Sequence, residues 1–208
     1  MLRHELPFRG PEALKLVAAR RVHILGAGAI GSNLAVTLAR QGFENMTVYD
    51  FDRVESHNIG NQAYGLDDVG SIKTAALNTI IFASCGLEIT QIPIKVTDKI
   101  LRKHVSKTDL IVDCFDNSAS RKLVFDLAGE LSLDCVHAGF NGPYAEIRWN
   151  EKYIVPSDAG EDVCEYPLAR NLVTLLVSVL AEVIVRYVTR TEKINESITF
   201  NDLKLHRD

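Results

Sequence analysis

A glycine-rich turn between an apolar segment and a helical pattern constrains the fold of this chain more than any other feature. Residues 21–25 are predicted to form a buried strand, and residues 32–40 a helix whose apolar side chains recur every four positions. Three glycines stand in the spacing GxGxxG. The first lets the chain turn sharply, the second lets the backbone approach a pyrophosphate, and the third lets the helix pack close to the strand. Backbone N–H groups at the helix start then face the anion. The predicted phosphate-binding turn comprises Gly26, Gly28, Ala29, Ile30 and Gly31.

An acidic residue follows this turn at the distance that a nucleotide site requires. A second strand is predicted over residues 46–50, and it ends in Asp50, about twenty residues beyond the glycines. A carboxylate at that strand end can accept hydrogen bonds from ribose hydroxyls. The alternative is a glycine turn that serves only the packing of helix on strand. The register of strand, helix and acid favours the nucleotide site.

Strands and helices alternate along most of the chain, which indicates an α/β fold with a Rossmann-like, doubly wound and mainly parallel sheet. At 208 residues the chain has the size of one domain, taken as residues 1–208. Pockets in such sheets open at the carboxyl ends of the strands, so Asp50 and Asp116 are expected at the same mouth as the glycine turn. Further strands are predicted over residues 87–96, 110–116, 134–138 and 144–149, and further helices over residues 71–83, 100–105 and 120–131.

Composition argues against several classes of function. The formal charge of −4 comes without any Lys/Arg-rich run, which argues against nucleic acid and anionic membranes as partners. The longest apolar stretch, residues 172–185, is shorter than the ~20 residues of a membrane span. The first residues lack the apolar run of a secretory signal, which favours a cytoplasmic protein. Four cysteines without a CxxC pair argue against structural zinc and disulfides.

Four motifs follow one another along the chain. They are Gly26-Ala-Gly-Ala-Ile-Gly31, Tyr49-Asp-Phe-Asp52-x-Val-Glu-x-x-Asn58-Ile-x-x-Gln62, Gly70-x-x-Lys73 and Asp113-Cys-Phe-Asp116-Asn117-x-x-x-Arg121. As a series they resemble the signature of the ThiF/MoeB/HesA adenylyltransferases, bacterial relatives of ubiquitin-activating enzymes. The resemblance implies a fold that binds ATP with magnesium and adenylates the C-terminal carboxylate of a small ubiquitin-like or sulfur-carrier protein of the ThiS/MoaD kind.

The resemblance also implies a role for each polar residue of these motifs. Lys73 contacts the triphosphate and neutralises charge that develops when a carboxylate is joined to the α-phosphate. Asp116 holds magnesium, an ion that prefers hard oxygen ligands, with Asn117 beside it. Lys73 and Asp116 are expected to face the solvent-filled mouth, and Arg121 is expected to support the Asp116 loop through hydrogen bonds. Without the resemblance, Lys73 would be a solvated helix lysine and Asp116 a helix-capping carboxylate. The residues that bind the ribose or order the loop around the nucleotide are Asp50, Asp52, Asn58 and Gln62.

The chain departs from the family pattern at Asn61. The family motif has an arginine there that reaches the phosphates, and an asparagine lacks its fixed charge and forked donors. A second family arginine, supplied from a partner subunit's N-terminal segment, has no clear match, and Arg3 and Arg9 are candidates by position only. Three interpretations stay open: another cation compensates, adenylation is slow, or the chain binds nucleotide without catalysis.

Cys164 stands just before the long apolar helix, where several relatives carry a cysteine on a crossover loop that forms a thioester or persulfide with the carrier. Its neighbours here include Glu161 and Asp162, whose negative charge disfavours the nucleophilic thiolate. We therefore interpret Cys164 as a loop thiol more readily than as a covalent catalyst. Cys114 and His137 are expected to be structural.

Two rival functions stay open beside ATP-dependent adenylation. A catalytically weak family member that only binds nucleotide or carrier is favoured by Asn61. An NAD(P)- or FAD-dependent oxidoreductase would explain Asp50 but leaves Lys73 and the motif around Asp116 without a role. The helix predicted over residues 170–190 is apolar around most of its circumference. It is therefore expected either in the core or in the interface of a homodimer, the form in which relatives pair.

Overall fold

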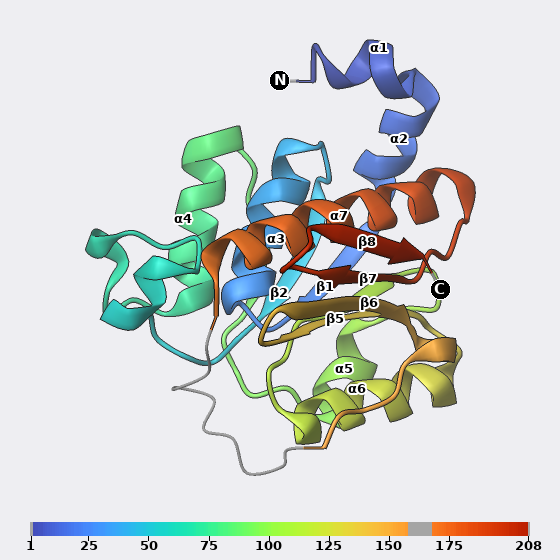
Figure 1. Ribbon diagram of the computed structural model, residues 1–208. Coiled ribbons are helices and arrows are strands. Elements are labelled where there is room, and N and C mark those ends of the chain that lie inside the picture. The colour runs from blue at the N-terminus through green and yellow to red at the C-terminus, as the bar shows by residue number, and fades with distance from the viewer. Residues whose placement is uncertain (1, 158–167, 208) are drawn as a thin grey trace.

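The computed structural model describes residues 2–157 and 168–207, and within them eight strands form one sheet (Figure 1). The strands are β1 (Arg21–Leu25), β2 (Asn45–Tyr49), β3 (Thr90–Ile92), β4 (Leu110–Asp113), β5 (Asp134–Asn141), β6 (Tyr144–Trp149), β7 (Glu196–Thr199) and β8 (Lys204–Arg207). Their order across the sheet is β3-β2-β1-β4-β5-β6-β7-β8. The first five run parallel, and β6, β7 and β8 each pair antiparallel with the strand before them. This confirms the predicted α/β fold with a mainly parallel sheet.

Helices cover both faces of the sheet. The α-helices are α1 (Glu5–Arg9), α2 (Pro11–Ala19), α3 (Ala29–Arg40), α4 (Lys73–Cys85), α5 (Asp98–His104), α6 (Ser118–Leu131) and α7 (Arg170–Arg190). Short 3₁₀ helices are η1 (Ser56–Gly60), η2 (Leu66–Asp68) and η3 (Asn150–Lys152). Helices α3, α4 and α7 lie on one face, α5 and α6 lie on the other, and α1 projects from the body beyond α2 (Figure 1). This arrangement is the doubly wound architecture expected from the alternation of elements.

Two hydrophobic cores follow from this arrangement, one on each face of the sheet. On β1, Val22 and Ile24 belong to the core under α3 and α7, whereas Leu25 belongs to the core under α5 and α6. Successive side chains of a strand point to opposite faces, so a strand covered on both sides needs apolar residues at nearly every position. This burial on both faces explains why β1 and β4 appear in the sequence as short, nearly continuous apolar runs.

Helix α7 is packed into the core. By length and composition alone it could cross a membrane, but 61% of its most apolar window is buried inside the molecule. Its exposed positions include the polar residues Asn171, Thr174 and Ser178. Its apolar circumference is therefore used within the chain, and of the two placements expected for this helix the structure supports the core.

Several segments differ from the expectations. The strand expected over residues 87–96 is reduced to β3, because Pro93 has no N–H for a ladder and pairing stops before it. Helix α3 begins at Ala29 rather than Ser32, inside the glycine turn. The segment after β2, expected as a loop, contains η1 and η2. Helices α1 and α2 and the hairpin of β7 and β8 are not among the expected elements.

Candidate functional site

The glycine turn between β1 and α3 combines a tight backbone with open space. Gly26 has a φ of +94°, a conformation that L side chains rarely adopt. A Cβ on Gly31 would lie 1.9 Å from the carbonyl oxygen of Gly26, so only glycine lets α3 lie this close to the turn. A Cβ on Gly28 would meet no atom within 4 Å, and no side chain caps the start of α3. The turn therefore presents the first amides of α3 to a space that a phosphate can enter.

Asp50, directly after β2, is tied to the glycine turn. Its Oδ2 accepts a hydrogen bond from the Ala27 amide at 2.7 Å, and its Oδ1 accepts one from the Asp52 amide at 2.8 Å. Burial raises the pKa of the Asp50 carboxyl, although the Lys73 ammonium and these two amides oppose the shift. Each carboxylate oxygen keeps a lone pair for a further donor, which fits the ribose-binding role expected for Asp50.

Lys73 is the first residue of α4 and is only 8% exposed. Its Nζ lies 3.4 Å from Asp52 Oδ2, and its charge also acts on Asp50. The expectation that Lys73 faces a solvent-filled mouth is therefore wrong: the side chain is packed in, and the ammonium is held against the acids that follow β2. One cation and two carboxylates thus form a compact group beside the glycine turn.

Asn58 organises the loop that follows β2. It is 5% exposed, its Oδ1 accepts from the Glu55 amide at 2.9 Å, and its carbonyl oxygen accepts from the Gln62 amide at 2.9 Å. The carbonyl oxygen of Asn61 accepts from Asn33 Nδ2 at 2.9 Å, which joins the loop to the start of α3. The structure therefore brings Asn58, Asn61 and Gln62 to the side of the glycine turn.

Asp116 and Asn117 follow the carboxyl end of β4, also next to the glycine turn. A Cβ on Gly26 would lie 3.2 Å from the carbonyl oxygen of Cys114, so the two segments touch. Asn117 caps α6 by accepting from the Ser120 amide at 2.9 Å, and its Nδ2 donates to Asp116 Oδ1 at 3.2 Å. The capping role considered for Asp116 thus belongs to Asn117. The carboxylate of Asp116 is exposed, as expected.

A single exposed carboxylate suits one kind of metal site. Within residues 2–157 and 168–207, no group of three or more His, Cys, Asp or Glu side chains is arranged to hold a metal ion. Mg²⁺ is commonly bound by one or two carboxylates together with phosphate oxygens and water. Asp116, near the start of α3 where phosphate can enter, fits a magnesium ion that arrives with a nucleotide.

Arg121 lies behind this loop in a buried polar network. Its guanidinium donates to a β5 carbonyl at 2.9 Å and to the Tyr153 hydroxyl at 3.1 Å. Asp113, fully buried, lies 3.7 Å from the guanidinium and accepts hydrogen bonds from His137 Nδ1 at 2.8 Å and from the Phe115 amide at 3.0 Å. Arg121 therefore supports the Asp116 loop through Asp113 rather than by a bond of its own. Sequence reasoning missed Asp113, although it stands in the same motif.

The two cysteines singled out from the sequence have different outcomes. Cys114 is buried, and burial raises the pKa of its thiol, which agrees with a structural role. Cys164 lies outside the described residues, so its interpretation as a loop thiol stays a prediction. His137 is fully engaged in the Asp113 network, in line with the structural role expected for it.

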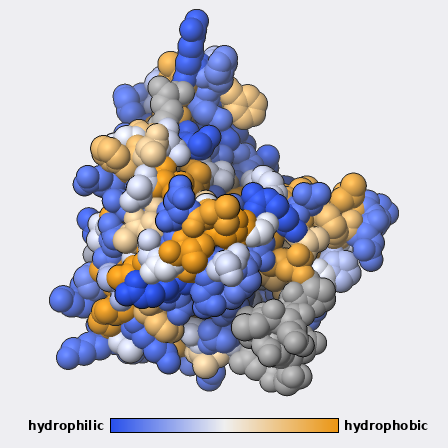
Figure 2. All heavy atoms as spheres, turned by 90° about the vertical axis from the view of Figure 1, so that its left-hand side faces the viewer, coloured by the Kyte–Doolittle hydropathy of each residue, from blue (hydrophilic) through white to orange (hydrophobic). Residues whose placement is uncertain are grey.

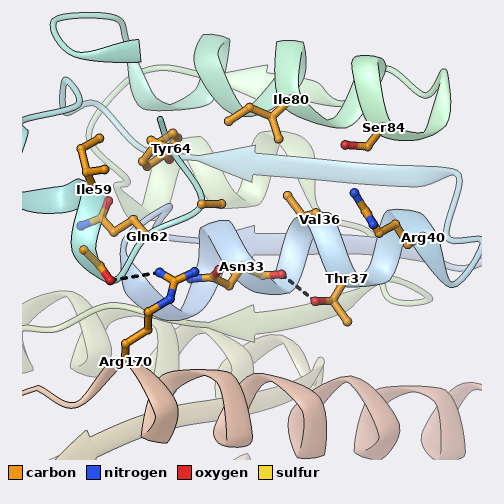
Figure 3. Close-up of a pocket in the computed structure, with 12 residues that line it drawn as sticks. Asn33, Val36, Thr37, Arg40, Ile59, Gln62, Tyr64, Ile80, Ser84 and Arg170 are labelled. Atoms are coloured by element: carbon orange, nitrogen blue, oxygen red, sulfur yellow. Dashed lines mark hydrogen bonds between the residues drawn. The ribbon is translucent and has the colours of Figure 1, made fainter. Parts of the chain in front are cut away.

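A cavity of about 500 Å³ lies between α3 and α4, beside residues 58–62 after β2, which we call the nucleotide loop (Figure 3). Residues 59–60 and 62–64 form one end of it, Asn33 and Arg40 contribute from α3, and Arg170 reaches it from the start of α7. Neither Asp50 nor Asp116 lines it. The cavity therefore adjoins the candidate nucleotide site rather than forming it.

Comparison with known proteins places these motifs in a family. The model of the ThiF family matches residues 2–161. The molybdopterin-synthase adenylyltransferase of Escherichia coli is 34% identical over 116 residues, which are 55% of this chain and 45% of that protein. The sulfur carrier protein ThiS adenylyltransferase of Bacillus subtilis is 29% identical over 139 residues, which are 65% of this chain and 41% of that protein. The chain thus spans less than half the length of these relatives.

A solved structure shares the fold. The crystal structure of E. coli MccB with ATP superposes with a TM-score of 0.78 at 18% sequence identity, covering 94% of this chain and 65% of that chain. At this level of identity the likeness concerns architecture, and it agrees with the Rossmann-like, doubly wound sheet.

Proposed function

Because the chain belongs to the ThiF family, we propose that it uses ATP and Mg²⁺ to adenylate the C-terminal carboxylate of a small sulfur-carrier or ubiquitin-like protein. The observation that carries the proposal is the convergence of three motifs at one edge of the sheet: the glycine turn, the group around Asp50 and Lys73, and the Asp116 loop. The names of both curated relatives, which are adenylyltransferases, support it.

The chemistry requires charge stabilisation rather than a strong base. A carboxylate oxygen of the carrier attacks the α-phosphorus of ATP and forms a new P–O bond. The bond from this phosphorus to the bridging oxygen breaks, and pyrophosphate leaves with the electron pair. No proton is transferred, but two anions must approach each other. We assign Lys73 to neutralise phosphate charge and Asp116 to hold the Mg²⁺ that shields the leaving group.

The remaining residues of the site act on the nucleotide's position. The Asp50 carboxylate accepts hydrogen bonds from the ribose hydroxyls, while the amides of Ala27 and Asp52 hold it in place. Asp52 orients Lys73 through their contact at 3.4 Å. Asn58 and Gln62 hold the loop beside α3. In this assignment, strands β1, β2 and β4 each end in one part of the nucleotide site.

We also propose a homodimer that works in the cytoplasm. The projecting N-terminal helices expose Leu6, Phe8 and Leu16, and Phe8 is 80% exposed, which favours contact with a second copy. Helix α7 lends no support, because its apolar residues are buried within the chain. A monomeric mass at micromolar concentration in analytical ultracentrifugation would contradict the dimer.

For the carrier protein, we propose the face that bears α4 and the segments after β2. Apolar side chains gather among polar ones on this face (Figure 2). Large apolar side chains exposed in these segments include Phe51, Leu66 and Phe82. Exposed apolar groups beside a polar site favour docking of a protein substrate.

A second candidate is a family member that binds nucleotide or carrier with little catalysis. Asn61 favours it, because an asparagine cannot place a fixed positive charge on the phosphates. The two candidates make the same prediction for ATP binding and opposite predictions for turnover.

Exchange of labelled pyrophosphate into ATP tests the proposal, with the full 208-residue chain and purified B. subtilis ThiS as the carrier. We expect exchange that needs Mg²⁺ and ThiS, and we expect Lys73→Ala and Asp116→Ala to lower it by about 10² or more. Matched controls are Lys107→Ala and Glu44→Ala, which remove exposed charges at the amino ends of the strands and should leave exchange unchanged. ATP binding without exchange favours the second candidate. Tight NAD binding without ATP binding contradicts both.

A further inference from the structure

Arg170 places a guanidinium against the nucleotide loop. Its Nη1 donates to the carbonyl oxygen of Gly60 at 3.0 Å, one residue before Asn61. Figure 3 shows the side chain rising from the start of α7 toward Asn33 and Gln62. Helix α7 packs against α3, so the contact follows from the fold although the two segments are far apart in the sequence. A cation other than Lys73 therefore reaches this loop.

The charge of Arg170 is not neutralised within the part of the chain that the structure describes. Its interaction there is the single bond to Gly60, which leaves most of its five N–H donors for another acceptor. Among the described residues that line this cavity there is a second arginine, Arg40, and no Asp or Glu. Arg9, by contrast, is bound to both Glu5 and Glu182. An uncompensated guanidinium at a cavity wall attracts an anion.

The position of the loop indicates which anion this is. The bond from Asn33 to Asn61 fastens the loop to the start of α3, where phosphate can enter. Asp50, assigned to the ribose, is bound to the Ala27 amide, which precedes the start of α3 in the glycine turn. A triphosphate that runs from the ribose past the start of α3 therefore approaches the loop that Arg170 contacts.

We propose that Arg170 binds the phosphates of ATP beyond the α-phosphate and supplies the positive charge that Asn61 lacks. The inference rests on the proposed ATP-dependent function and adds a phosphate-binding residue to it. During adenylation the guanidinium stays paired with the two phosphates that leave as pyrophosphate, and it gives up no proton. Its planar fork of donors suits phosphate oxygens.

Calorimetric titration of ATP and of AMP, each with Mg²⁺, tests this on the full chain without any carrier. We expect Arg170→Ala to weaken ATP binding about tenfold, which corresponds to about 1.4 kcal/mol, and to leave AMP binding unchanged. Arg170→Lys should recover part of the loss, because it restores charge without the fork. Arg40→Ala removes the same charge from the far end of the same cavity, and it should change neither affinity.

A rescue separates contact with phosphate from support of the loop. Adding Asn61→Arg to Arg170→Ala should restore ATP binding, because the new guanidinium would start from the same loop. Unchanged ATP affinity in Arg170→Ala overturns the inference, and so does an equal loss of ATP and AMP, which would mean that Arg170 only holds the loop. If the wild-type chain binds neither nucleotide, the proposed function fails and the inference with it. Circular dichroism of each variant checks that the fold is kept.

Discussion

Two buried histidines, one on each strand beside β4, each bind a buried aspartate, and the two aspartates stand at opposite ends of β4. His23 Nε2 lies 3.0 Å from Asp109 Oδ2, and His137 Nδ1 lies 2.8 Å from Asp113 Oδ2. Asp109 immediately precedes β4 and Asp113 ends it, so a single strand carries one carboxylate at each end. Comparing the two His–Asp pairs shows how the position of the aspartate, before or at the end of β4, changes the surroundings of the same two residue types.

The network at the amino end of β4 is closed and holds a neutral ring. Tyr49 donates its hydroxyl to His23 Nδ1 at 2.9 Å, and Nε2–H donates to Asp109, so both ring nitrogens are satisfied by one tautomer. Asp109 also accepts from the Ser106 amide at 2.8 Å, and Arg21 lies 3.8 Å away with a side chain that is 56% exposed. Among the described residues, the side chains of this network make no hydrogen bond to the nucleotide loop, although the backbone carbonyl of Tyr49 accepts from the Gly26 amide at 2.9 Å.

The network at the carboxyl end contains a buried full charge and holds part of the site. Asp113 faces the guanidinium of Arg121 as well as His137, whose ring stacks on Tyr153 with centroids 3.8 Å apart. Its Oδ1 also fixes the Phe115 amide at 3.0 Å, in the turn that leads to the exposed carboxylate of the site. Ligands of parallel sheets bind at the carboxyl ends of the strands. The same pair of residue types therefore lies away from the candidate site at the amino end of β4 and supports the turn that leads to it at the carboxyl end.

The largest expected difference between the two networks is in their contribution to the free energy of unfolding. Asp113→Asn leaves Arg121 as a buried charge without its counter-ion, which should lower the free energy of unfolding by about 3–5 kcal/mol. Asp109→Asn should cost about 1–3 kcal/mol, because its neighbour His23 is neutral and Arg21 reaches solvent. Urea denaturation of both variants measures the difference. Equal losses would show that the charge of Arg121 does not distinguish the two networks.

The second largest difference between the two networks should be in nucleotide affinity. His137→Gln loosens Asp113 and with it the turn before Asp116, and a small displacement of a metal-binding carboxylate should weaken Mg–ATP binding about tenfold, or about 1.4 kcal/mol. His23→Gln should leave the affinity at the wild-type value, since the ring of His23 bonds only the Tyr49 hydroxyl and Asp109 among the described residues and neither bond positions a side chain of the candidate site. Calorimetric titration measures both. An equal loss of Mg–ATP affinity in His23→Gln would contradict the distinction between the two networks.

The closed network should also appear in the pH dependence of stability. Burial lowers the pKa of His23 below its ordinary value of 6.5. On acidification below about 6.5 the unfolded chain binds a proton that the folded chain does not, so stability falls as the pH falls toward the folded pKa. We expect this group to contribute a slope of up to about 1.4 kcal/mol per pH unit between pH 7 and pH 5, and His23→Gln to lose that part. Urea denaturation at several pH values between 5 and 7 measures this dependence. Identical slopes of stability against pH in the wild type and His23→Gln would refute the expectation.

The parallel half of the sheet could be predicted because its signals are local. The spacing of Gly26 and Gly31 and the double-sided apolar runs of β1 and β4 are read from consecutive residues. The hairpin of β7 and β8 could not be predicted, because each strand has four residues of mixed polarity and β7 joins the sheet by pairing with β6, far earlier in the chain, while β8 pairs only with β7. Sequence patterns of period 2 need longer runs than these to stand out.

The candidate site was predictable as a set of residue types and less so as a geometry. Motif positions single out Asp50, Lys73 and Asp116 as candidates, and the fold brings their segments to the carboxyl ends of the parallel strands. The burial of Lys73 and the indirect action of Arg121 depend on contacts with other elements, which no local pattern encodes. Arg170 escaped sequence reasoning for the same reason, since its contact with the nucleotide loop comes from the packing of α7 on α3.

The smallest expected difference concerns single hydroxyl groups, and it tests whether charge alone separates the two networks. Tyr49→Phe leaves His23 Nδ1 as a buried acceptor without a donor, which should cost about 1–3 kcal/mol. Tyr153→Phe removes one acceptor of the Arg121 guanidinium, worth about 1.5–3 kcal/mol, but keeps the stacking on His137. The two losses in the free energy of unfolding, measured by urea denaturation, should therefore agree within about 1 kcal/mol. A much larger loss in Tyr153→Phe would mean that the carboxyl-end network is rigid as a whole, so that its contrast with the amino end comes from packing as well as from the buried charge.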